Sequence, residues 1–242
     1  SRLEPRRQCP LDSGSICGSR SADSMEDRAA KAAAEWDPLY QNGGAPFGPV
    51  PFAGLDTILR DAFTLGSRVL DVGAGYGRDS LYLAREVGCK VTAVEPSEAG
   101  CSAIRSAADK LTQECGSVDV VQCCASEIAD RCMCLDASVD GVLFDSVLNF
   151  IAEEYRGPVL QSCLQKLRPE GVIMVIEFED PEKKGWVADC LRKEALASGS
   201  VLRVDLDEHL VVCHAIFDGE DTEMRWLVTT ARKSAGPQEG PP

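Results

Sequence analysis

The sequence predicts an α/β protein built on a doubly wound, mostly parallel β-sheet. Short apolar runs of strand length alternate with segments of helical periodicity, which is typical of a parallel sheet covered by helices. A glycine-rich turn directly follows the first strand, where α/β proteins place a ligand. A chain of 242 residues can bury the core of one such domain. The predicted strands cover residues 69–72, 90–95, 118–123, 139–145 and 172–178.

The segment before the first strand is predicted to hold two helices joined by a loop. Residues 1–24 are polar and irregular, so we expect them to be disordered. Alanine-rich residues 25–36 predict a helix that ends at Asp37-Pro38, and residues 52–63 predict a second helix. The Gly/Pro-rich loop 39–51 between them is either a linker or a lid over a substrate. We expect a single domain over residues 25–233, with the N-terminal helices and lid candidate at 25–66 and a flexible tail at 234–242.

The turn after the first strand is rich in glycine and preceded by an acid. Gly73, Gly75 and Gly77 allow positive φ and a close approach of the backbone to a bound molecule. The helix predicted over residues 79–86 would point its N-terminal N–H groups at the same place. Asp71 stands two residues before the first glycine, where its charge would repel a pyrophosphate. The pattern therefore favours a ligand that carries positive charge and hydroxyl groups.

Two adenosine-containing cofactors compete for such a turn. A nicotinamide dinucleotide needs the spacing G-x-G-x-x-G, and Arg78 occupies the third glycine position of that pattern. The sequence D-x-G-x-G-x-G from Asp71 to Gly77 instead resembles motif I of the class I S-adenosylmethionine (SAM)-dependent methyltransferases. In that family the turn lies against the methionine part and the ribose of SAM, and the acid helps to hold the amino group. The resemblance implies a Rossmann-like, seven-stranded sheet whose last strand is antiparallel.

The ends of the next two strands extend the resemblance. Glu95 ends the second strand, and an acid there in this family accepts hydrogen bonds from both ribose hydroxyls. After the third strand the family often has an Asp that meets the adenine amino group, but this chain has Cys124. The backbone N–H groups of Ala125 and Ser126, or the carboxylate of Glu127, would then hold the adenine. The implied cofactor-binding residues are Asp71, Gly73, Ala74, Gly75, Gly77, Glu95, Pro96, Cys124, Ala125, Ser126 and Asp145.

The fourth strand supplies candidates for the region beside the transferred methyl group. In parallel sheets the pocket lies outside the carboxyl ends of the strands, and Asp145 ends this strand while Ser146 and Asn149 follow it. Tyr40 belongs to the lid candidate. We therefore take Asp145, Asn149 and Tyr40 as the catalytic candidates. An equally good interpretation makes Asp145 a cap of the next turn and Asn149 an exposed residue.

The following segments repeat the helix–strand pattern. Residues 158–167 predict an amphipathic helix. Leu167 to Gly171 form an L-x-P-x-G turn, which recurs before the fifth strand in the same family. A further helix is predicted over residues 181–197.

The C-terminal region predicts a hairpin. Two β-rich runs, 210–217 and 224–230, are joined by Asp218-Gly219-Glu220-Asp221, and Asp-Gly between such runs is a strong hairpin signal. His209 and His214 lie here, and a histidine in a strand is more often packed or exposed than catalytic.

Composition argues against several kinds of partner. The formal net charge of −14 disfavours nucleic acid, and no apolar run reaches the roughly 18 residues of a membrane span. Residues 1–24 lack the apolar core of a secretory signal, so we expect a cytoplasmic protein, with a removed organelle-targeting segment left open. The 12 cysteines include no C-x-x-C, so we expect no metal site. Cys132 and Cys134 are either surface thiols or ligands of a soft metalloid.

The resemblance implies a SAM-dependent methyltransferase that acts on a small molecule. The sulfonium methyl group is already activated, so a thiolate or other soft nucleophile needs positioning but no strong base. Apart from Asp145, no base is evident beside the fourth strand, which favours such an acceptor. Residues 75–84 and the segment Trp36-Asp37-x-Leu39-Tyr40 are similar to the tellurite-resistance and thiol methyltransferase branch of the family.

Three alternatives stay open on the sequence. The acceptor atom could be oxygen or nitrogen. The chain could be a non-catalytic protein of the same fold that serves as a binding module. Cys124 in place of the Asp at the adenine position is compatible with this alternative. A nicotinamide oxidoreductase is disfavoured by Asp71 and by the glycine spacing. The Asn/Asp-Pro-Pro-Tyr/Phe signature of enzymes that methylate amino groups of nucleic acids or proteins is missing after the fourth strand, and the oligomeric state is not indicated.

Overall fold

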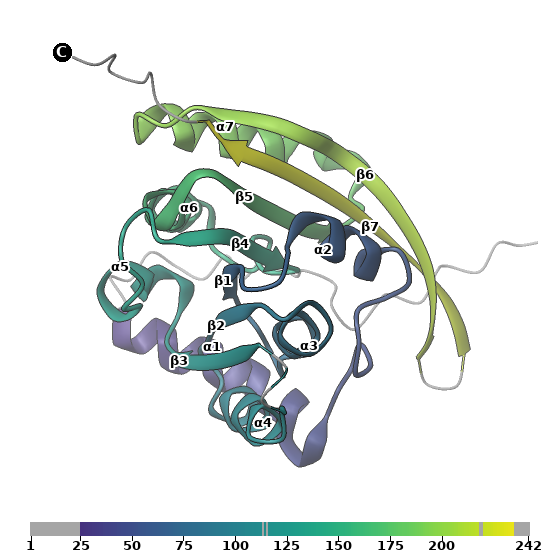
Figure 1. The fold of residues 1–242 in the computed structure, drawn as a ribbon. Helices are drawn as coiled ribbons and strands as arrows, with labels where there is room; N and C mark the ends of the chain where they lie inside the picture. The colour runs from purple at the N-terminus through teal and green to yellow at the C-terminus, as the bar shows by residue number, and fades with distance from the viewer. Residues whose placement is uncertain (1–24, 113, 115, 218–219, 235–242) are drawn as a thin grey trace, which may run out of the picture.

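A seven-stranded sheet forms the centre of the molecule. The computed structural model describes residues 25–112, 114, 116–217 and 220–234 (Figure 1). The strand order is β3-β2-β1-β4-β5-β7-β6; the first five strands of this order pair in parallel, and β7 runs antiparallel to both of its neighbours, β5 and β6. The predicted fold class is therefore confirmed. The strands are β1 (Arg68–Val72), β2 (Lys90–Glu95), β3 (Ser117–Gln122), β4 (Val139–Asp145), β5 (Leu167–Phe178), β6 (Leu202–Phe217) and β7 (Glu220–Lys233).

Helices cover both faces of the sheet, and each face buries its own apolar cluster (Figure 1). On one face α5, α6 and α7 pack against apolar side chains such as Val142 and Ile173. On the other face α2 and α3 pack against Leu143 and Met174. Residues that alternate along one strand thus point into different clusters, which explains why the central strands are apolar throughout. The helices are α1 (Met25–Tyr40), α2 (Leu55–Ala62), α3 (Arg78–Tyr82), α4 (Glu98–Ala108), α5 (Ile128–Arg131), α6 (Glu153–Lys166) and α7 (Trp186–Ala197).

Two helices contain a proline at which the sequence predicts one of their ends. Helix α1 runs through Asp37 and Pro38 to Tyr40, so the predicted end at Asp37-Pro38 is wrong. Pro38 removes one N–H close to the C-terminus, where few further helical bonds depend on it. Helix α6 begins at Glu153 and contains Pro158, so the predicted start at Pro158 is also wrong. The first turns of α6 are anchored by Arg156, whose Nε donates to two carbonyls of the preceding loop.

Three other boundaries differ from the prediction for local backbone reasons. The helix after β1 is α-helical only to Tyr82 and continues as a π-helix over Leu83–Val87. The helix predicted over 181–197 is divided by Gly185 (φ 72°) into a 3₁₀ turn, Pro181–Lys183, and α7. The L-x-P-x-G turn is part of β5, where the pairing with β4 shifts register between Val139 and Gly141.

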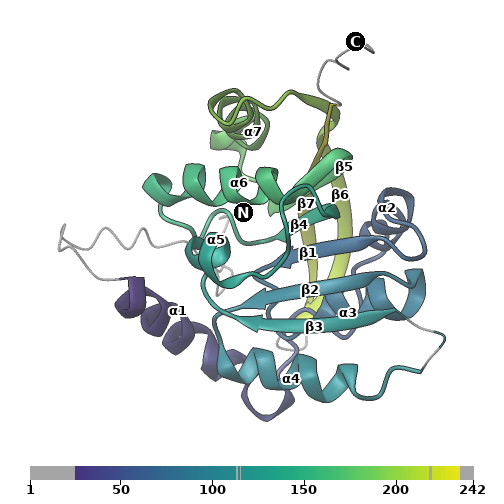
Figure 2. The ribbon, with the colours of Figure 1, turned by 60° about the vertical axis from the view of Figure 1, so that its left-hand side comes forward.

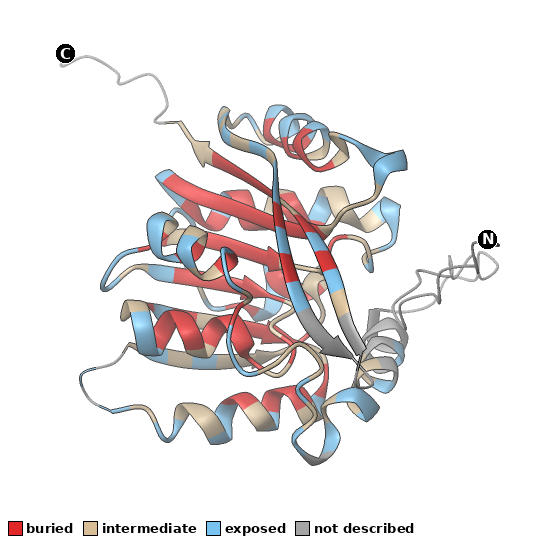
Figure 3. Cartoon of the chain, turned by 90° about the vertical axis from the view of Figure 1, so that its right-hand side faces the viewer, coloured by how far each residue is buried: buried red, intermediate tan, exposed pale blue. Residues whose placement is uncertain are grey.

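The C-terminal hairpin is present and longer than predicted. β6 and β7 pair from Leu202↔Lys233 to Phe217↔Glu220, whereas β7 pairs with β5 only from Trp226 to Arg232. The two strands therefore extend as a ribbon beyond the sheet, and the ribbon crosses in front of the buried strands in Figure 3. The Asp218-Gly219 turn lies outside the described residues, as do residues 1–24 and 235–242 of the predicted flexible ends. Within the described helices, none is long and apolar enough to cross a membrane.

The contact between α2 and β4 allows a test of the core. A Cβ at Gly141 would lie 2.1 Å from Cε1 of Phe63, which is itself buried. Gly141→Ala should lower the free energy of unfolding by about 1–3 kcal/mol, because overpacking displaces the ring. Urea denaturation measures the change. Adding Phe63→Leu should recover part of the loss, since the smaller side chain makes room, and strictly additive effects of the two substitutions would contradict the assignment.

Candidate functional site

The glycine turn lies at the carboxyl end of β1 and is held by the neighbouring strand. The N–H groups of Gly73 and Ala74 both donate to the carbonyl of Val94, at 2.8 and 3.0 Å. The three glycines all have positive φ, from 59° to 91°. A Cβ at Gly77 would lie 2.7 Å from Cγ1 of Ile104 on α4, so this glycine also lets the turn pack against the next helix. The local sequence thus fixes a tight, rigid turn that exposes backbone at the sheet edge.

Asp71 lies below this turn in the interior of the protein. Its side chain is 2% exposed, and Oδ2 accepts a hydrogen bond from Ser80 Oγ at 2.5 Å. Burial, with the charge of Asp79 nearby, raises the pKa of Asp71 to about 7. The carboxyl group can therefore carry a proton near neutral pH, and a cationic ligand group beside it would favour the ionised form.

Glu95, at the end of β2, joins the turn to the start of α4. Its Oε2 accepts from the N–H of Gly75 at 2.8 Å, and its Oε1 accepts from the N–H of Ser97 at 2.9 Å. Burial raises the pKa of Glu95 to about 7. The two backbone bonds fix the orientation of the carboxylate, and each oxygen keeps a second lone pair for a ligand hydroxyl.

Helix α1 lies along the carboxyl edge of the sheet, next to α4 (Figure 2). The Oδ1 of Asp37 accepts hydrogen bonds from Ser97 Oγ and from the N–H of Ala99 at the start of α4. The indole of Trp36 makes an edge-on contact with the ring of Phe150, which follows β4, at a centroid distance of 5.0 Å. The helix therefore contacts segments that follow two different strands.

The loop after α1 is fastened to the glycine turn. Tyr76 Oη donates to the carbonyl of Gly48 at 2.7 Å and accepts from the N–H of Phe47 at 3.2 Å. The ring of Tyr40 lies 5.8 Å from that of Tyr76, and a Cβ at Gly75 would lie 3.1 Å from Tyr40 Oη. Burial and the nearby Glu95 carboxylate raise the pKa of Tyr40, so its hydroxyl stays protonated. Tyr40 is thus at the site as a hydroxyl group and a ring, not as a base.

Farther along the same loop, aromatic rings attach it to the opposite end of the sheet edge. Phe47 and Phe52 lie 6.4 and 5.7 Å from the buried Trp226 of β7, measured between ring centroids. Phe178 at the end of β5 stacks on the same indole at 4.0 Å. Loop 41–54 therefore spans from the glycine turn to β7, as a cover of the sheet edge would.

A buried ionic cluster connects the glycine turn with the end of β4. Arg78 is 7% exposed and donates to both carboxylate oxygens of Asp79, at 3.0 and 3.1 Å, and to Asp145 Oδ2 at 2.5 Å. Its guanidinium also lies over the ring of Phe52, 5.4 Å from the centroid. The two acids keep the pKa of Arg78 above its ordinary value, whereas burial beside Asp79 raises the pKa of Asp145. The Arg78 guanidinium thus pairs with both Asp79 and Asp145, so the Asp145 carboxylate already has a bonded partner.

The loop after β4 is held by a buried acid from β5. Glu177 is 2% exposed and accepts from the N–H of Leu148 and from Asn149 Nδ2, both at 2.8 Å. Burial raises its pKa to about 7. Arg156 adds a hydrogen bond from Nε to the carbonyl of Leu148. The alternative that Asn149 is simply exposed is therefore wrong, because its amide is half-buried and bonded to Glu177.

The corner after β3 is a short 3₁₀ turn, Ala125–Glu127. Glu127 Oε2 accepts from the N–H of Cys124 at 2.8 Å, so this carboxylate is occupied by the cap. The first N–H groups of such a turn have no partner within it, which leaves Ala125 and Ser126 as the better candidates for a ligand contact. Burial raises the pKa of Cys124 to about 11, so its thiol is neutral at pH 7.

Other chemically notable residues lie away from this edge. Cys132 and Cys134 precede β4, at the opposite end of that strand from Asp145. His209 and His214 are exposed on the edge strand β6. Within the described part of the chain, no group of three His, Cys, Asp or Glu side chains is arranged to hold a metal.

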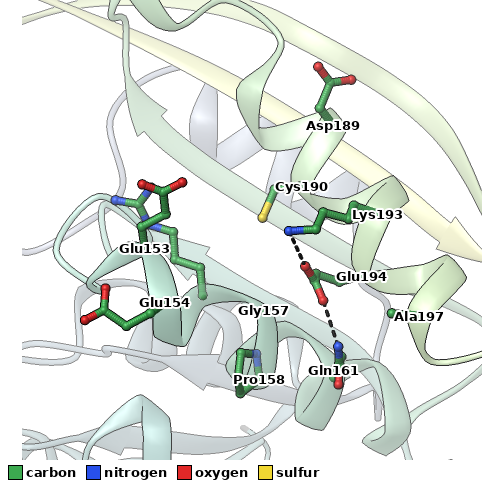
Figure 4. A pocket seen from close by; sticks show the side chains of 11 residues that line it. Glu153, Glu154, Gly157, Pro158, Gln161, Asp189, Cys190, Lys193, Glu194 and Ala197 are labelled. Atoms are coloured by element: carbon green, nitrogen blue, oxygen red, sulfur yellow. Dashed lines mark hydrogen bonds and ion pairs between the residues drawn. The ribbon is translucent and has the colours of Figure 1, made fainter.

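A separate groove of about 880 Å³ lies between α6 and α7 (Figure 4). Its one buried acid, Glu194, is bonded to Gln161 at 2.7 Å and paired with Lys193 at 3.5 Å. No residue of the glycine turn or of the strand ends lines the groove, so we do not assign it to the same site. The lining residues are Glu153, Glu154, Arg156, Gly157, Pro158, Gln161, Asp189, Cys190, Lys193, Glu194 and Ala197.

Sequence reasoning missed three polar groups that organise the site. Asp37 gave no signal as a partner of α4, because the contact joins residues 60 or more positions apart. In the sequence, Arg78 was notable only because it occupies the third glycine position of the dinucleotide-binding pattern. Glu177 did leave a signal, since it is one acid inside the apolar run of β5. A charge in a buried strand needs a partner, and that partner is found only in the folded chain.

The buried Asp71 predicts a particular dependence of stability on pH. Its folded pKa is raised from 3.8 to about 7, so its contribution to the free energy of unfolding is fully present below pH 3.8 and lost as the pH rises through 7. Asp71→Asn keeps an acceptor for Ser80 and should remove this loss, which is on the order of 1–4 kcal/mol. Urea unfolding at pH 5 and pH 8 measures it. The exposed Asp130→Asn is the control, and an unchanged pH slope in Asp71→Asn would refute the prediction.

The attachment of the loop by Tyr76 can be tested separately. Tyr76→Phe removes both hydrogen bonds to the loop while keeping the ring. We expect faster hydrogen exchange or proteolysis over residues 44–52, by about threefold to tenfold, since one such bond contributes about 1 kcal/mol. Tyr82→Phe is the matched control, because the Tyr82 hydroxyl bonds to Arg60 and to the carbonyl of Asp56. Equal loosening of the loop in the two variants would contradict the attachment.

A family of known function matches the middle of the chain. Residues 69–171, from β1 into β5, match the family described as "Methyltransferase domain". This region contains the glycine turn, Glu95, the corner after β3 and Asp145. No curated protein matches the sequence significantly.

Solved structures share the fold over most of the chain. The 1,6-didemethyltoxoflavin-N1-methyltransferase of Burkholderia thailandensis, with bound 1,6-didemethyltoxoflavin and S-adenosylhomocysteine, superposes with a TM-score of 0.61 at 22% identity over 90% of this chain and 94% of that chain. The arsenic (III) SAM methyltransferase CrArsM of Chlamydomonas reinhardtii gives 0.52 at 23% identity over 87% and 74%. The [4+2]-cyclase SpnF gives 0.54 at 19% identity over 75% and 80%. At these identities the likeness concerns the fold.

Proposed function

Because the chain carries a class I SAM-dependent methyltransferase domain, with SAM as its cofactor, we propose that it methylates a small molecule whose accepting atom is a soft nucleophile such as a thiol. The observation that supports this most is the state of the three catalytic candidates. Asp145 is bonded to Arg78 and Ser146, Asn149 is bonded to Glu177, and Tyr40 has a raised pKa. A thiol ionises far more readily than an alcohol, so it needs the least help from a base.

The residues at the sheet edge fit an adenosyl cofactor. We assign the ribose hydroxyls to Glu95, whose carboxylate is oriented by Gly75 and Ser97. We assign the amino group to the neighbourhood of Asp71 and the adenine to the corner at Ala125 and Ser126. When bound, SAM supplies a methyl group on a positively charged sulfur. Gly73, Ala74, Gly77 and Pro96 complete the expected backbone surface around it, and Cys124 stands beside the adenine position.

The surrounding residues position the reactants and exclude water. Arg78 fixes the end of β4 against the glycine turn, and α1 with loop 41–54 covers the edge. Holding two reactants in line is the main contribution a protein can make to such a transfer, worth up to about 7–11 kcal/mol. Neutral Cys124 and protonated Tyr40 leave the cofactor side free of competing nucleophiles.

Two other functions are possible results of the binding and turnover experiments described below. An oxygen or nitrogen acceptor would need a base, and Asp145 with its raised pKa is the residue that would serve. The similar structures include the [4+2]-cyclase SpnF as well as methyltransferases, so a protein of this fold can also bind ligands for another reaction.

Cofactor binding is the first test of the proposal. We expect micromolar binding of SAM and S-adenosylhomocysteine in isothermal titration, and no binding of NADH. Glu95→Gln should weaken binding at least about tenfold, because a hydrogen bond to a charged group contributes about 1.5–3 kcal/mol. Glu177→Gln is the matched control, since Glu177 is equally buried but holds the loop after β4. Absence of adenosyl binding by the unchanged protein would refute the cofactor role.

The acceptor is tested by turnover with SAM and matched small molecules. Thiols should be methylated faster than the corresponding alcohols and amines. Asp145→Asn weakens the pairing with Arg78 that holds the end of β4 and can slow every acceptor, but it should not slow thiols more than alcohols and amines, because a thiol requires no base. A thiol rate that falls by a larger factor than the alcohol and amine rates in Asp145→Asn, in a protein that still binds S-adenosylhomocysteine, would contradict the soft-nucleophile mechanism. Binding without turnover of any acceptor would favour the binding-module alternative.

A further inference from the structure

The segment Cys132-Met133-Cys134 places two thiols together on a face of the sheet that the proposed transfer does not use. Cys132 directly follows α5 as its C-cap and is 4% exposed, whereas Cys134 is half-buried. The two cysteines are two residues apart in the chain, and each thiol influences the pKa of the other. Met133, between them, is 87% exposed, so the segment lies at the surface and a small reagent can reach it.

Polar groups from other elements surround this pair. Lys166 of α6 is 5% exposed, and its Nζ donates to the carbonyls of Cys132 and Cys134, at 3.3 and 2.8 Å. The Sγ of Cys134 lies 3.6 Å from Thr92 Oγ1 on β2. Arg68 of β1 contributes a further positive charge. The segment is therefore held in place through its backbone carbonyls, and the positive charges of Lys166 and Arg68 act on the Cys134 thiol.

The two thiols differ in acidity for reasons visible in this arrangement. The neighbouring Cys132 thiol, the Thr92 hydroxyl and the charge of Lys166 lower the pKa of Cys134 to about 6. The same contact and burial raise the pKa of Cys132. In the described part of the chain, each other cysteine with a shifted pKa has it raised. A thiolate beside a protonated partner is the arrangement of a reactive cysteine and its resolving cysteine.

We propose that Cys132 and Cys134 form a redox-reactive dithiol, in which the Cys134 sulfur attacks a hydroperoxide and the Cys132 thiol resolves the product. The thiolate of Cys134 takes the terminal oxygen of hydrogen peroxide and becomes a sulfenic acid, and hydroxide leaves. The Cys132 sulfur then displaces that hydroxyl group to form the disulfide, and the Cys132 proton leaves with it as water. The sulfur pair loses two electrons, and the peroxide gains them.

The chain itself offers a direct readout of this reaction. Trypsin cleaves after Arg131 and Arg156, and the peptide 132–156 contains Cys132 and Cys134 as its only cysteines. The disulfide therefore appears as the loss of two hydrogen atoms from one peptide, whereas oxidation of Met133 adds an oxygen atom. We treat the reduced full-length protein with equimolar hydrogen peroxide at pH 7, quench with iodoacetamide and measure this peptide by mass spectrometry.

Alkylation rates and three substitutions make the test specific. Cys134 should react with iodoacetamide at least about tenfold faster than Cys190, a half-buried cysteine of α7 whose pKa is raised. Thr92→Val keeps the side-chain shape and should slow Cys134 severalfold. Cys132→Ser should stop at a sulfenic acid on Cys134 that dimedone traps. Cys134→Ser should leave Cys132 reduced, and circular dichroism checks that each variant is folded.

Either of two results would overturn the proposal. One is that the peptide 132–156 stays reduced while another cysteine, such as Cys190, is oxidised. The other is that Cys134→Ser is oxidised at Cys132 as fast as the unchanged protein. Because SAM plays no part in these measurements, failure of the dithiol leaves the methyltransferase assignment intact, and failure of cofactor binding leaves the dithiol intact.

Discussion

The buried ion cluster around Arg78 is the interaction on which the arrangement of the site depends. The guanidinium joins the helix after the glycine turn to the end of β4 through Asp145, and it lies over Phe52 of the covering loop. A charge buried to this extent costs several kcal/mol unless it is paired and hydrogen-bonded. The bidentate contact with Asp79 and the contact with Asp145 meet this need. The pairing therefore fixes the relative position of the glycine turn and the end of β4.

The same edge of the sheet collects further buried acids, and this has consequences for the chemistry. Asp71, Glu95 and Glu177 each have a pKa raised to about 7 by burial. Each is also held by hydrogen bonds from backbone or side-chain groups, so it is oriented before any ligand arrives. Such preorganised acceptors suit a cationic, hydroxyl-bearing ligand and would oppose a phosphate. The overall charge of −14 points in the same direction.

The N-terminal segment completes this edge through contacts distributed over the whole sheet. Asp37 contacts the start of α4, Trp36 contacts Phe150 after β4, and Phe47 lies near Trp226 of β7. The linker and the lid interpretations of loop 39–51 thus differ only in whether the loop breaks these contacts and moves away from the sheet edge. The dithiol at Cys132 and Cys134 lies at the opposite end of β4, which separates its chemistry from the proposed transfer.

The sequence by itself determined the order of the strands and helices, the glycine turn and the acid at the end of β2. These features depend on residues close together in the chain, and hydrophobic periodicity and glycine spacing report them. β2 and β4 have the predicted bounds, whereas α1 and α6 continue through Pro38 and Pro158 because contacts with other segments hold their ends.

Only the tertiary structure decided which polar candidates are free to act. As predicted, Asp145 ends β4 and Asn149 follows it, but Arg78 and Glu177 engage them from other segments of the chain. Tyr40 reaches the glycine turn because α1 folds back over the sheet edge. The physical reason is that a buried polar group must find a partner, and partners that lie 28 or 67 residues away leave no local pattern in the sequence.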